Sequence, residues 1–312
     1  MRVASIDIGT NTILMLIADL AENGTLTVLS DEQRIARVGK GVDKTGAIAW
    51  EAFSRSESIL EEYLATARSM RVDVIRATGT SALRDAHNRE DYLNYMQQRL
   101  DLDIEILDGA DEALWTYGGA ISGFTERKGR FAVLDIGGGS TELTSGEGFR
   151  IIERKSLDIG CVRLTEKFLP HSPPREQELL ALIDHVDHAV RQFPHFDVHD
   201  TVFVGVAGTV TTLAAVELGL ESYDRNAVAG FRLSRETIER RYRQFSALSK
   251  EELQHALRID PGRADIILVG VVILLRFMTA RGLPDVTVSE RGLRYGIALR
   301  EWERELERST MS

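Results

Sequence analysis

The sequence predicts an α/β protein built of two related domains. Three observations lead to this prediction. The chain has 312 residues, and a domain takes roughly 150 residues on average. Short apolar segments alternate with amphipathic helical segments, which is typical of helices that cover sheets. A strand that ends in an Asp-Ile-Gly turn occurs twice, at Asp7 and at Asp135, and such an internal repeat indicates two copies of one structural unit.

The first predicted domain covers residues 1–126 and opens as an antiparallel meander. Its three strands are short apolar segments at 2–8, 12–19 and 26–30. Asn23 and Gly24, between the last two strands, are a tight-hairpin signal. The elements that follow alternate between helix and strand: a helix at 50–70, a strand at 72–77, a helix at 81–100, a strand at 103–107 and a helix at 110–121.

The second predicted domain covers residues 127–294 and begins after a polar link at 125–130. It repeats the opening meander with strands at 131–136, from 142 and at 149–156. Its later elements are helices at 174–192, 210–218, 234–257 and 263–279 and strands at 201–206 and 284–288. A last helix is predicted at 293–307, and we expect the chain from about 295 to 312 to pack back on the first domain.

Charge and cysteine content narrow the class of protein. The formal net charge is -10, from 48 acidic and 38 basic side chains. This argues against a partner that is a nucleic-acid polymer, which needs a basic face. The negative net charge is compatible with an anionic substrate, because backbone N–H groups and local basic clusters bind phosphate in acidic proteins too. Cys161 is the only cysteine, so we expect a small buried side chain and a chain without an intramolecular disulfide.

Nothing in the sequence predicts a membrane partner. The N-terminal segment has no apolar stretch of the signal-peptide kind and is predicted to be a strand. The longest apolar run, 266–275, is too short for a bilayer, which needs about 20 residues, and we interpret it as a buried helix. We therefore expect a cytoplasmic location.

The second Asp-Ile-Gly turn is the richer in glycine, because Gly137, Gly138 and Gly139 follow in a row. Successive backbone N–H groups in such a turn can bind an anion, and glycines let a phosphate chain approach closely. Ser140 and Thr141 add hydroxyl donors. A single turn of this kind fits a plain hairpin equally well, but two in one chain favour phosphate binding.

Asp135 and Glu142 flank this turn and can face the same side. Two carboxylates suit Mg²⁺, which prefers oxygen ligands and usually keeps several waters; Mn²⁺ is the alternative. A zinc site is not predicted, because the seven histidines form no H-E-x-x-H pattern. His185 and His188 share a predicted helix face without a third ligand.

Two further turns lead from a strand into a helix. Gly205–Thr209 places a helix N-terminus at a potential anion site, although simple close packing explains its glycines as well. Arg84 lies in the first turns of its predicted helix, where the helix dipole disfavours a cation. This position favours a role toward an anion; the alternative is a surface ion pair with Asp85 or Glu90.

The start of the predicted helix at 110–121 is acidic, with Asp108, Asp111 and Glu112. A carboxylate at this sheet edge could deprotonate a water, but acidic residues are common in first helical turns because of the helix dipole. From the residues alone the dipole explanation is favoured.

Gly39 and Lys40 do not form a P-loop, because the expected first glycine and the Ser/Thr are missing.

Together these segments resemble the exopolyphosphatase/guanosine pentaphosphate phosphohydrolase (Ppx/GppA) family over nearly the whole chain. The matching segments are Asp7–Thr12, Gly79–Arg84 with Asn88, Asp111–Ala113, Asp135–Glu142, Gly160–Glu166, Gly205–Thr209, Arg263–Asp265 and Arg291–Gly296. The family has the fold of actin, sugar kinases and heat-shock ATPases. The resemblance therefore implies an α/β fold of two actin-like, ribonuclease H-like domains with a central cleft.

The resemblance also implies roles for individual residues. Glu112 matches the catalytic glutamate that activates the attacking water. Asp135 and Glu142 match the magnesium-associated carboxylates, and Asp7 is a third candidate metal ligand. The candidate substrate-phosphate residues are Thr10, Asn11, Thr12, Arg84, Gly137, Gly138, Gly139, Ser140, Thr141, Gly208, Thr209 and Arg263.

The activity implied by the resemblance is Mg²⁺-dependent release of terminal phosphate from inorganic polyphosphate, with a homodimer as a family-level expectation. The chain stops near residue 312, which matches the short form of the family; longer members add helical domains that help to bind long polyphosphate. Three positions depart from the family pattern: Leu114 where arginine is common, Leu14 where a basic or polar residue is usual, and Tyr295 where glutamate is common. Short polyphosphate is therefore the expected substrate.

Three other functions stay open at this point. The nearest is the same chemistry on guanosine pentaphosphate, which the apolar pair Ile13 and Leu14 puts in doubt. Another is a sensor that binds polyphosphate or an alarmone without turnover, against which Glu112, Asp135 and Glu142 argue. A sugar-kinase-like phosphotransferase is less well supported, because the whole-chain resemblance is to hydrolases.

Overall fold

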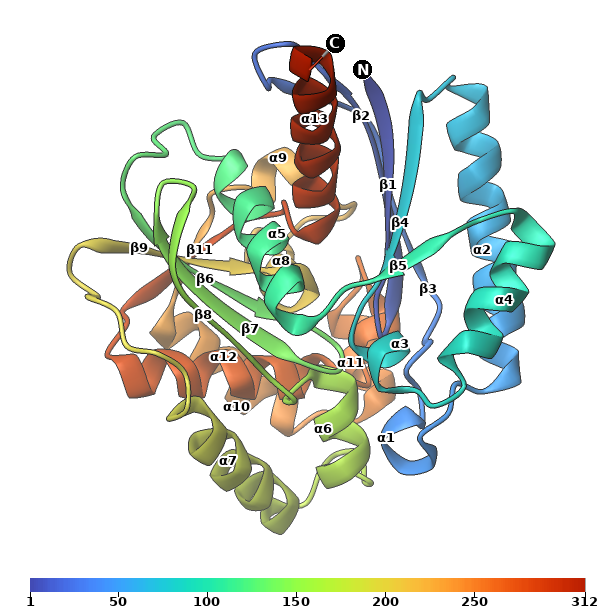
Figure 1. The fold of residues 1–312 in the computed structure, drawn as a ribbon. Helices are drawn as coiled ribbons and strands as arrows, with labels where there is room; N and C mark the ends of the chain where they lie inside the picture. The colour runs from blue at the N-terminus through green and yellow to red at the C-terminus, as the bar shows by residue number, and fades with distance from the viewer. Residues whose placement is uncertain (312) are drawn as a thin grey trace. The chain divides into compact units, whose positions relative to one another are not determined.

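The computed structural model describes residues 1–311, with side chains through residue 308. In this range the chain divides into two compact units (Figure 1). Unit 1 holds Met1–Gly119 together with the chain from Leu293 onward, and unit 2 holds Ala120–Gly292. The domain limits that we expected at residues 126 and 294 stay predictions.

Unit 1 contains a five-stranded sheet in the order β3-β2-β1-β4-β5. Its strands are β1 (Arg2–Ile8), β2 (Thr12–Leu20), β3 (Leu26–Ile35), β4 (Val74–Gly79) and β5 (Ile104–Ile106). The first three strands form the predicted antiparallel meander. β4 runs parallel to β1, and β5 runs parallel to β4.

Helices pack on both faces of this sheet, which is why β1 and β2 bury side chains on both sides. The helices that lie wholly or mostly in unit 1 are α1 (Val42–Thr45), α2 (Trp50–Ser69), α3 (Ser81–Asp85), α4 (Arg89–Leu100), α5 (Gly109–Ser122) and α13 (Leu293–Met311). On one face Ile6 packs with Phe53 of α2 and Tyr92 of α4. On the other face Val3 packs with Tyr295 of α13. Figure 1 shows α2 and α4 on one side of β1 and α13 on the other.

Unit 2 contains a six-stranded sheet in the order β10-β11-β9-β6-β7-β8. Its strands are β6 (Arg130–Ile136), β7 (Thr141–Glu147), β8 (Arg150–Leu157), β9 (Thr201–Val206), β10 (Arg232–Ser234) and β11 (Asp285–Val288). The series β8-β7-β6-β9-β11 has the strand order and directions of unit 1, and β10 is added antiparallel to β11. The repeat in the sequence is therefore a repeat of the fold.

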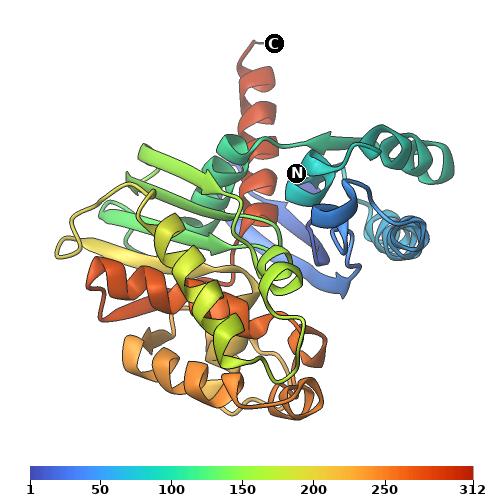
Figure 2. The same cartoon turned by 90° about the horizontal axis from the view of Figure 1, so that it is seen from below.

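The core of unit 2 lies between this sheet and a group of helices. These are α6 (Cys161–Phe168), α7 (Glu176–Val190), α8 (Ala207–Glu217), α9 (Arg225–Val228), α10 (Arg235–Ser246), α11 (Lys250–Ala256) and α12 (Ile267–Arg281), with a 3₁₀ turn at Pro261–Arg263. α12 buries every residue from Ile267 to Leu275 and packs against α6, α7, α8 and α10 (Figure 2). The predicted buried helix at this position is confirmed. Among the described residues, no helix combines the length and apolar character needed to cross a membrane.

The structure corrects the sequence prediction at several elements. The helix that we predicted at 81–100 is two helices, α3 and α4, because the chain is extended at Ala86 between them. The side chain of Asn88 holds this break: it accepts a hydrogen bond from Ile48 N at 2.9 Å and donates to Ile48 O at 3.0 Å. Four short elements were not predicted: α1, α6, α9 and β10. Each has fewer than nine residues, too few for a clear periodic pattern.

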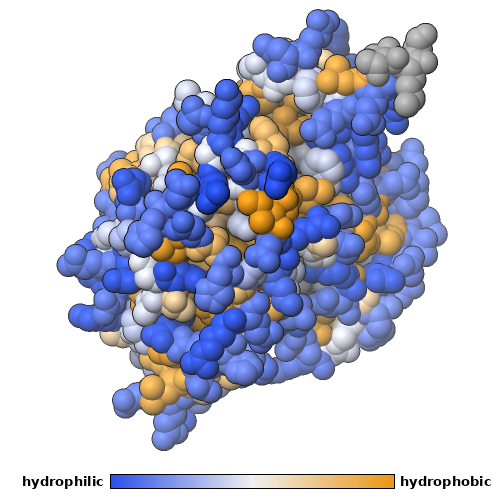
Figure 3. Space-filling view, turned by 60° about the vertical axis from the view of Figure 1, so that its left-hand side comes forward, coloured by the Kyte–Doolittle hydropathy of each residue, from blue (hydrophilic) through white to orange (hydrophobic). Residues whose placement is uncertain are grey.

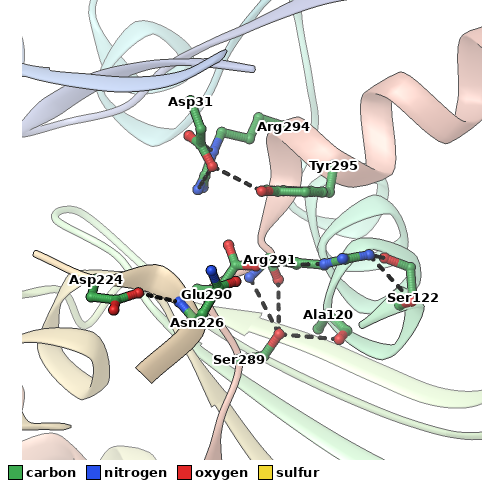
Figure 4. Close-up of polar contacts among 10 residues, drawn as sticks. All are labelled: Asp31, Ala120, Ser122, Asp224, Asn226, Ser289, Glu290, Arg291, Arg294 and Tyr295. Carbon is green, nitrogen blue, oxygen red and sulfur yellow. Dashed lines mark hydrogen bonds and ion pairs between the residues drawn. The ribbon is translucent and has the colours of Figure 1, made fainter. Parts of the chain in front are cut away.

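One polar cluster fixes the start of α13, and another fixes the end of α5 (Figure 4). In unit 1, Arg294 donates two hydrogen bonds to the Asp31 carboxylate, at 2.8 and 2.9 Å, and Tyr295 donates a third at 2.8 Å. In unit 2, Ser289 donates to Ala120 O at 3.1 Å. Bidentate arginine–carboxylate contacts are geometrically specific, so α13 has a defined place on the edge strand β3.

The surface drawn in Figure 3 is mostly hydrophilic, with hydrophobic residues in small groups. This fits the charged fraction of 28% in the sequence. Scattered apolar residues are normal on a protein surface and need no partner.

Candidate active site

The two Asp-Ile-Gly turns have the same backbone geometry. In unit 1, Gly9 N donates to Thr12 O at 3.0 Å; in unit 2, Gly137 N donates to Ser140 O at 3.0 Å. Each turn joins two antiparallel strands. A side chain at either glycine would bring its Cβ within 3.0 Å of the carbonyl that accepts this bond. The glycine of each turn is thus required by a close approach of the backbone.

The two turns differ in the residues that face each other beside them. Asp135 is the register partner of Glu142 in unit 2, whereas Asp7 is the register partner of Leu14 in unit 1. Directly opposed residues of antiparallel strands have Cβ atoms about 4.5–5.5 Å apart. Unit 2 therefore brings two carboxylates together, and unit 1 supplies one.

The carboxylate pair of unit 2 fits a magnesium ion in chemistry. Glu142 is 2% exposed, and its Oε1 accepts a hydrogen bond from Ser156 Oγ at 2.7 Å. This bond orients the side chain. Within the described residues there is no cluster of three or more His, Cys, Asp or Glu side chains placed to hold a metal. Mg²⁺ is commonly held by one or two carboxylates together with waters and substrate phosphates, and a pair such as Asp135 and Glu142 matches this pattern.

The glycine-rich turn of unit 2 is held from behind by the start of α6. Cys161 N donates to Gly137 O at 2.9 Å, and Val162 N donates to Gly138 O at 2.8 Å. Arg163 Nε donates to Gly139 O at 2.8 Å. These bonds occupy the carbonyl groups of Gly137, Gly138 and Gly139, and Gly137 N already donates to Ser140 O. The N–H groups of Gly138–Ser140 are therefore the candidates for binding an anion.

Gly160 is the residue that permits this contact. A Cβ at Gly160 would lie 2.4 Å from the backbone of Gly138 and 2.5 Å from that of Gly139. The resemblance to the family includes Gly160–Glu166, but it implied no role for this segment. No helix was predicted after Gly160 from the sequence, and the turn that Gly160 packs against lies more than 20 residues earlier in the chain.

A second candidate anion site in unit 2 lies where β9 ends and α8 begins. Ala207 adopts a left-handed φ of 67°, which turns the chain sharply into α8. The Arg263 guanidinium lies over the next residue, since a Cβ at Gly208 would come within 1.8 Å of its Cζ atom. Arg263 Nε donates to Asp260 Oδ2 at 2.7 Å. The predicted residues Gly208, Thr209 and Arg263 are therefore neighbours, with a cation held at a helix N-terminus.

Thr209 and Cys161 connect these two parts of unit 2. The Cys161 Sγ and Thr209 Oγ1 atoms are 3.6 Å apart, and both residues are buried. Burial raises the pKa of the Cys161 thiol, while the contact with Thr209 opposes that change. A buried neutral thiol is inert, so the structure confirms the prediction of a small buried side chain.

In unit 1, the candidate base lies where β5 leads into α5. Asp108 Oδ1 accepts hydrogen bonds from Ala110 N and Asp111 N, both at 2.8 Å, and so satisfies the first N–H groups of the helix. Glu112 follows in the first turn and is only 8% exposed. Asp108 therefore caps the helix, which was not predicted from the sequence, and the Glu112 side chain is turned toward Arg84.

Arg84 and Glu112 form a partly buried ion pair. Arg84 Nη1 donates to Glu112 Oε2 and to Leu107 O, both at 3.0 Å. Burial raises the pKa of the Glu112 carboxyl; the nearby Arg84 charge and its hydrogen bond lower it, and Asp85 raises it further. The sequence placed Arg84 toward the substrate or toward Asp85 or Glu90, and a contact with Glu112 was not foreseen.

The first turn of unit 1 is buried under the segment that follows β3. Asn11 O accepts from Ala36 N at 3.0 Å and Arg37 N at 2.8 Å, and Thr10 O accepts from Gly39 N at 2.8 Å. Thr10, Asn11 and Thr12 are each 7% exposed. As in unit 2, the carbonyl groups of the turn are occupied by a neighbouring segment.

The candidate residues thus fall into two sets. Unit 1 carries Asp7, Thr10–Thr12, Arg84 and Glu112, and unit 2 carries Asp135–Glu142, Gly208, Thr209 and Arg263. Each set is gathered at one end of its sheet, because Ile8, Gly79 and Ile136 are the last residues of β1, β4 and β6. Ligands of open α/β sheets bind at such strand ends.

Comparison with known proteins identifies the family of this chain. The model of the Ppx/GppA phosphatase family matches residues 16–305. The chain belongs to this family. Exopolyphosphatase 2 of Mycobacterium tuberculosis is 35% identical over 314 aligned residues, which cover 96% of this chain and 98% of that protein. Guanosine-5'-triphosphate,3'-diphosphate pyrophosphatase of Vibrio parahaemolyticus is 31% identical over 217 residues, covering 69% of this chain and 43% of that protein.

The fold of the family is also known from solved structures. The Ppx/GppA family member of Aquifex aeolicus superposes with a TM-score of 0.82 at 31% identity, over 98% of both chains. The two units with their repeated strand order are therefore the two domains of an α/β, actin-like fold. The predicted family and the predicted fold class are both confirmed.

Proposed function

We propose that this Ppx/GppA protein is an exopolyphosphatase that hydrolyses the terminal phosphoanhydride bond of inorganic polyphosphate, with short chains as its substrate. The observation that carries the proposal is the full-length similarity to an exopolyphosphatase, combined with a buried glutamate at the start of α5. A chain with the two turns alone would bind phosphate. A buried carboxylate with a raised pKa supplies the base that hydrolysis requires.

The substrate phosphates are proposed to bind at the two turns and at the start of α8. The backbone N–H groups of Gly138–Ser140 and the first turn of α8 both favour negative charge. Arg263, which lies over Gly208 and is paired with Asp260, adds a guanidinium with further N–H donors. Thr10–Thr12 form the corresponding turn of unit 1. Each of these groups would help to neutralise charge on the phosphate oxygens as the bond breaks.

Glu112 is proposed to activate the attacking water. The water oxygen attacks the terminal phosphorus in line with the bridging oxygen, and the P–O bond to that oxygen breaks. The water proton passes to Glu112, and the shortened polyphosphate leaves as an oxyanion. Catalysis of this kind depends mostly on positioning and electrostatics, which fits a site made largely of backbone groups and one base.

The cofactor in this proposal is Mg²⁺, with Mn²⁺ as the alternative. Asp135 and Glu142 would hold it, because they are paired across β6 and β7 and Ser156 orients Glu142. Asp7, on the end of β1, is proposed as a further ligand. When bound, the ion would neutralise phosphate charge and orient the phosphoanhydride. Ser156 keeps the Glu142 oxygen aimed without adding charge.

Guanosine pentaphosphate is the second candidate substrate, and the similarity to the Vibrio parahaemolyticus protein supports it. The residue opposite Asp7 argues for polyphosphate. Leu14 places an apolar side chain beside the first turn, where a polar group could bind a nucleotide. A cytoplasmic location and a homodimer stay predictions, to be checked by cell fractionation and by light scattering.

The test is phosphate release from short polyphosphate, long polyphosphate and guanosine pentaphosphate, each with and without Mg²⁺. We expect the highest kcat/KM on short polyphosphate and turnover only with the metal. Faster phosphate release from the nucleotide would show that guanosine pentaphosphate is the preferred substrate. Tight binding of polyphosphate with no turnover in Mg²⁺ or Mn²⁺ would identify a sensor and refute the hydrolase.

A further inference from the structure

We propose that Arg84 is a positioning residue that holds the Glu112 carboxylate in place and in its charged form. In this role Arg84 acts through Glu112 and not as a ligand of the substrate. The inference rests on the proposed hydrolase function, in which Glu112 is the base. It changes the role that family resemblance implied for Arg84.

Arg84 links the side chain of the proposed base to the backbone just before its helix. Arg84 Nη1 donates at 3.0 Å both to Glu112 Oε2 and to Leu107 O. Leu107 directly follows β5, and Glu112 lies in the first turn of α5. One nitrogen therefore joins the backbone before the helix to the side chain within it. The side chains of Arg84 and Glu112 are only 21% and 11% exposed, so this contact is shielded from water.

The scaffold brings the two residues together. Arg84 lies on α3, which follows β4, and Arg84 N donates to Thr80 O at 2.9 Å. Leu107 N donates to Gly79 O at 3.0 Å, which joins the ends of β4 and β5. Gly79 lets both α3 and β5 pack closely here, because a Cβ there would lie 2.5 Å from Leu83 Cδ1 and 2.9 Å from Ile106 Cδ1. Parallel strands that end at one sheet edge thus carry both partners, which is the rigid support that a positioned base needs.

Electrostatics supports the same role. Burial raises the pKa of Glu112, and Arg84 lowers it. Asp85, also on α3, raises it. Two further acidic residues of unit 1, Asp108 and Asp111, lie at the exposed start of α5. A general base works only in its charged form, and Arg84 is the cation that opposes the burial.

The direction of the pH effect follows from these contacts. Without Arg84, burial and Asp85 act on Glu112 unopposed, so its pKa rises further. At a given pH a larger fraction of the base is then protonated, and it regains its charge at a higher pH than in the parent protein. Loss of a positioning residue therefore lowers kcat and shifts the acid limb of the pH–rate profile to higher pH. Loss of a substrate ligand raises KM and leaves that limb in place.

The experiment uses the full chain and the variants Arg84→Gln, Arg84→Lys and Arg294→Gln. Arg294→Gln is the matched control, because Arg294 forms a buried bidentate pair with Asp31 in the same unit, away from the base. Phosphate release from short polyphosphate is measured with Mg²⁺ from about pH 5 to about pH 9. Thermal unfolding of each variant reports any general loss of structure.

For Arg84→Gln we expect kcat near neutral pH to fall by about 10²-fold, recovery toward alkaline pH, and a KM within about threefold of the parent. Arg84→Lys keeps the charge and should retain most of the parent pH profile. Arg294→Gln should lower the unfolding temperature without moving the acid limb. If Arg84→Gln raises KM at least tenfold with an unchanged acid limb, Arg84 is a substrate ligand and the proposal is wrong.

A second readout does not depend on turnover. The Glu112 carboxyl carbon is titrated by ¹³C NMR in the metal-free protein, with Glu112→Gln to assign its signal. We expect Glu112 to titrate at higher pH in Arg84→Gln than in the parent; titration at the same pH overturns the inference. If the parent protein releases no phosphate, the proposed hydrolase function fails, while this titration still decides the role of Arg84.

Discussion

At the residue scale, the carboxylates of the two units lie in different surroundings. Glu112 is buried beside one guanidinium, and the net effect is a raised pKa. Glu142 is buried as well, but it accepts a neutral hydrogen bond from Ser156 and faces Asp135 across the strand pair. A carboxyl whose pKa is shifted toward the working pH can take up and release a proton, whereas two opposed carboxylates repel each other unless a cation lies between them. The surroundings therefore fit a base in unit 1 and a metal-binding pair in unit 2.

The first prediction concerns the base itself. Glu112→Ala removes the group that takes the water proton, so turnover of short polyphosphate should fall about 10²–10⁴-fold. Binding should persist, because the turns and Arg263 are untouched; isothermal titration with polyphosphate measures it. Asp111→Ala is the matched control, since Asp111 is an exposed acidic residue in the same first turn. Near-normal phosphate release by Glu112→Ala would rule out Glu112 as the base.

At the scale of elements, the glycine-rich turn depends on the helix behind it. The start of α6 donates to the carbonyls of Gly137 and Gly138, and Gly160 lets the two backbones meet. The turn is thus shaped by α6 as much as by its own glycines. This explains why a short helix of eight residues, which propensity alone does not predict, has a defined place in unit 2.

The second prediction tests this contact. Gly160→Ala places a Cβ 2.4 Å from the Gly138 backbone, so either the turn or α6 must shift. We expect a loss of about 1–3 kcal/mol in the free energy of unfolding, the range for overpacking, and a clear rise in KM for polyphosphate. Urea unfolding and steady-state kinetics measure the two effects.

Gly129→Ala serves as the control for Gly160→Ala. Gly129 lies in the same unit, and a Cβ there has no atom within 4 Å. Its stability and KM should match those of the parent protein. An unchanged KM in Gly160→Ala would show that the shape of the turn does not depend on α6.

At the scale of the whole molecule, the chain returns to unit 1 after completing unit 2. α13 covers the face of the unit 1 sheet that carries Val3 and Leu16. Gly296 lies against α5, because a Cβ there would be 1.8 Å from Trp115 O. Unit 1 is therefore built from an N-terminal segment and a C-terminal segment of the chain. In addition, α13 packs beside α5, the helix that carries Glu112.

The third prediction follows from this return. Ending the chain after Gly292 removes the buried residues Leu293, Tyr295, Ile297 and Ala298. At about 1.5–3 kcal/mol for a large apolar side chain, the loss is comparable to a typical total stability of about 5–15 kcal/mol. We expect no cooperative thermal unfolding of unit 1.

A second truncation, after Arg304, is the control for this prediction. It keeps these buried residues together with Arg300 and Glu301, and the side chains described in the removed segment, Glu305–Arg308, are all exposed. Its unfolding curve should be close to that of the parent protein. Cooperative unfolding of the chain that ends at Gly292, with the parent midpoint, would show that α13 is dispensable.

The sequence determined much of the local structure and the general chemistry of this protein. Strand and helix positions follow from apolar periodicity, and the repeated Asp-Ile-Gly turn indicated two copies of one unit with phosphate-binding turns. These features depend on residues close together in the chain. Prediction was wrong for the helix at 81–100, because its break is held by Asn88 bonding to Ile48, 40 residues away.

The tertiary structure decided the contacts that give the site its form. Arg84 contacts Glu112, 28 residues later in the chain, and α6 supports a turn that precedes it in the chain. The helix α13 covers one face of the sheet that begins at Arg2. No local pattern encodes these pairs, since they arise only when strands align and helices pack between them. The residue types pointed to phosphate chemistry, and the partner of each residue came from the fold.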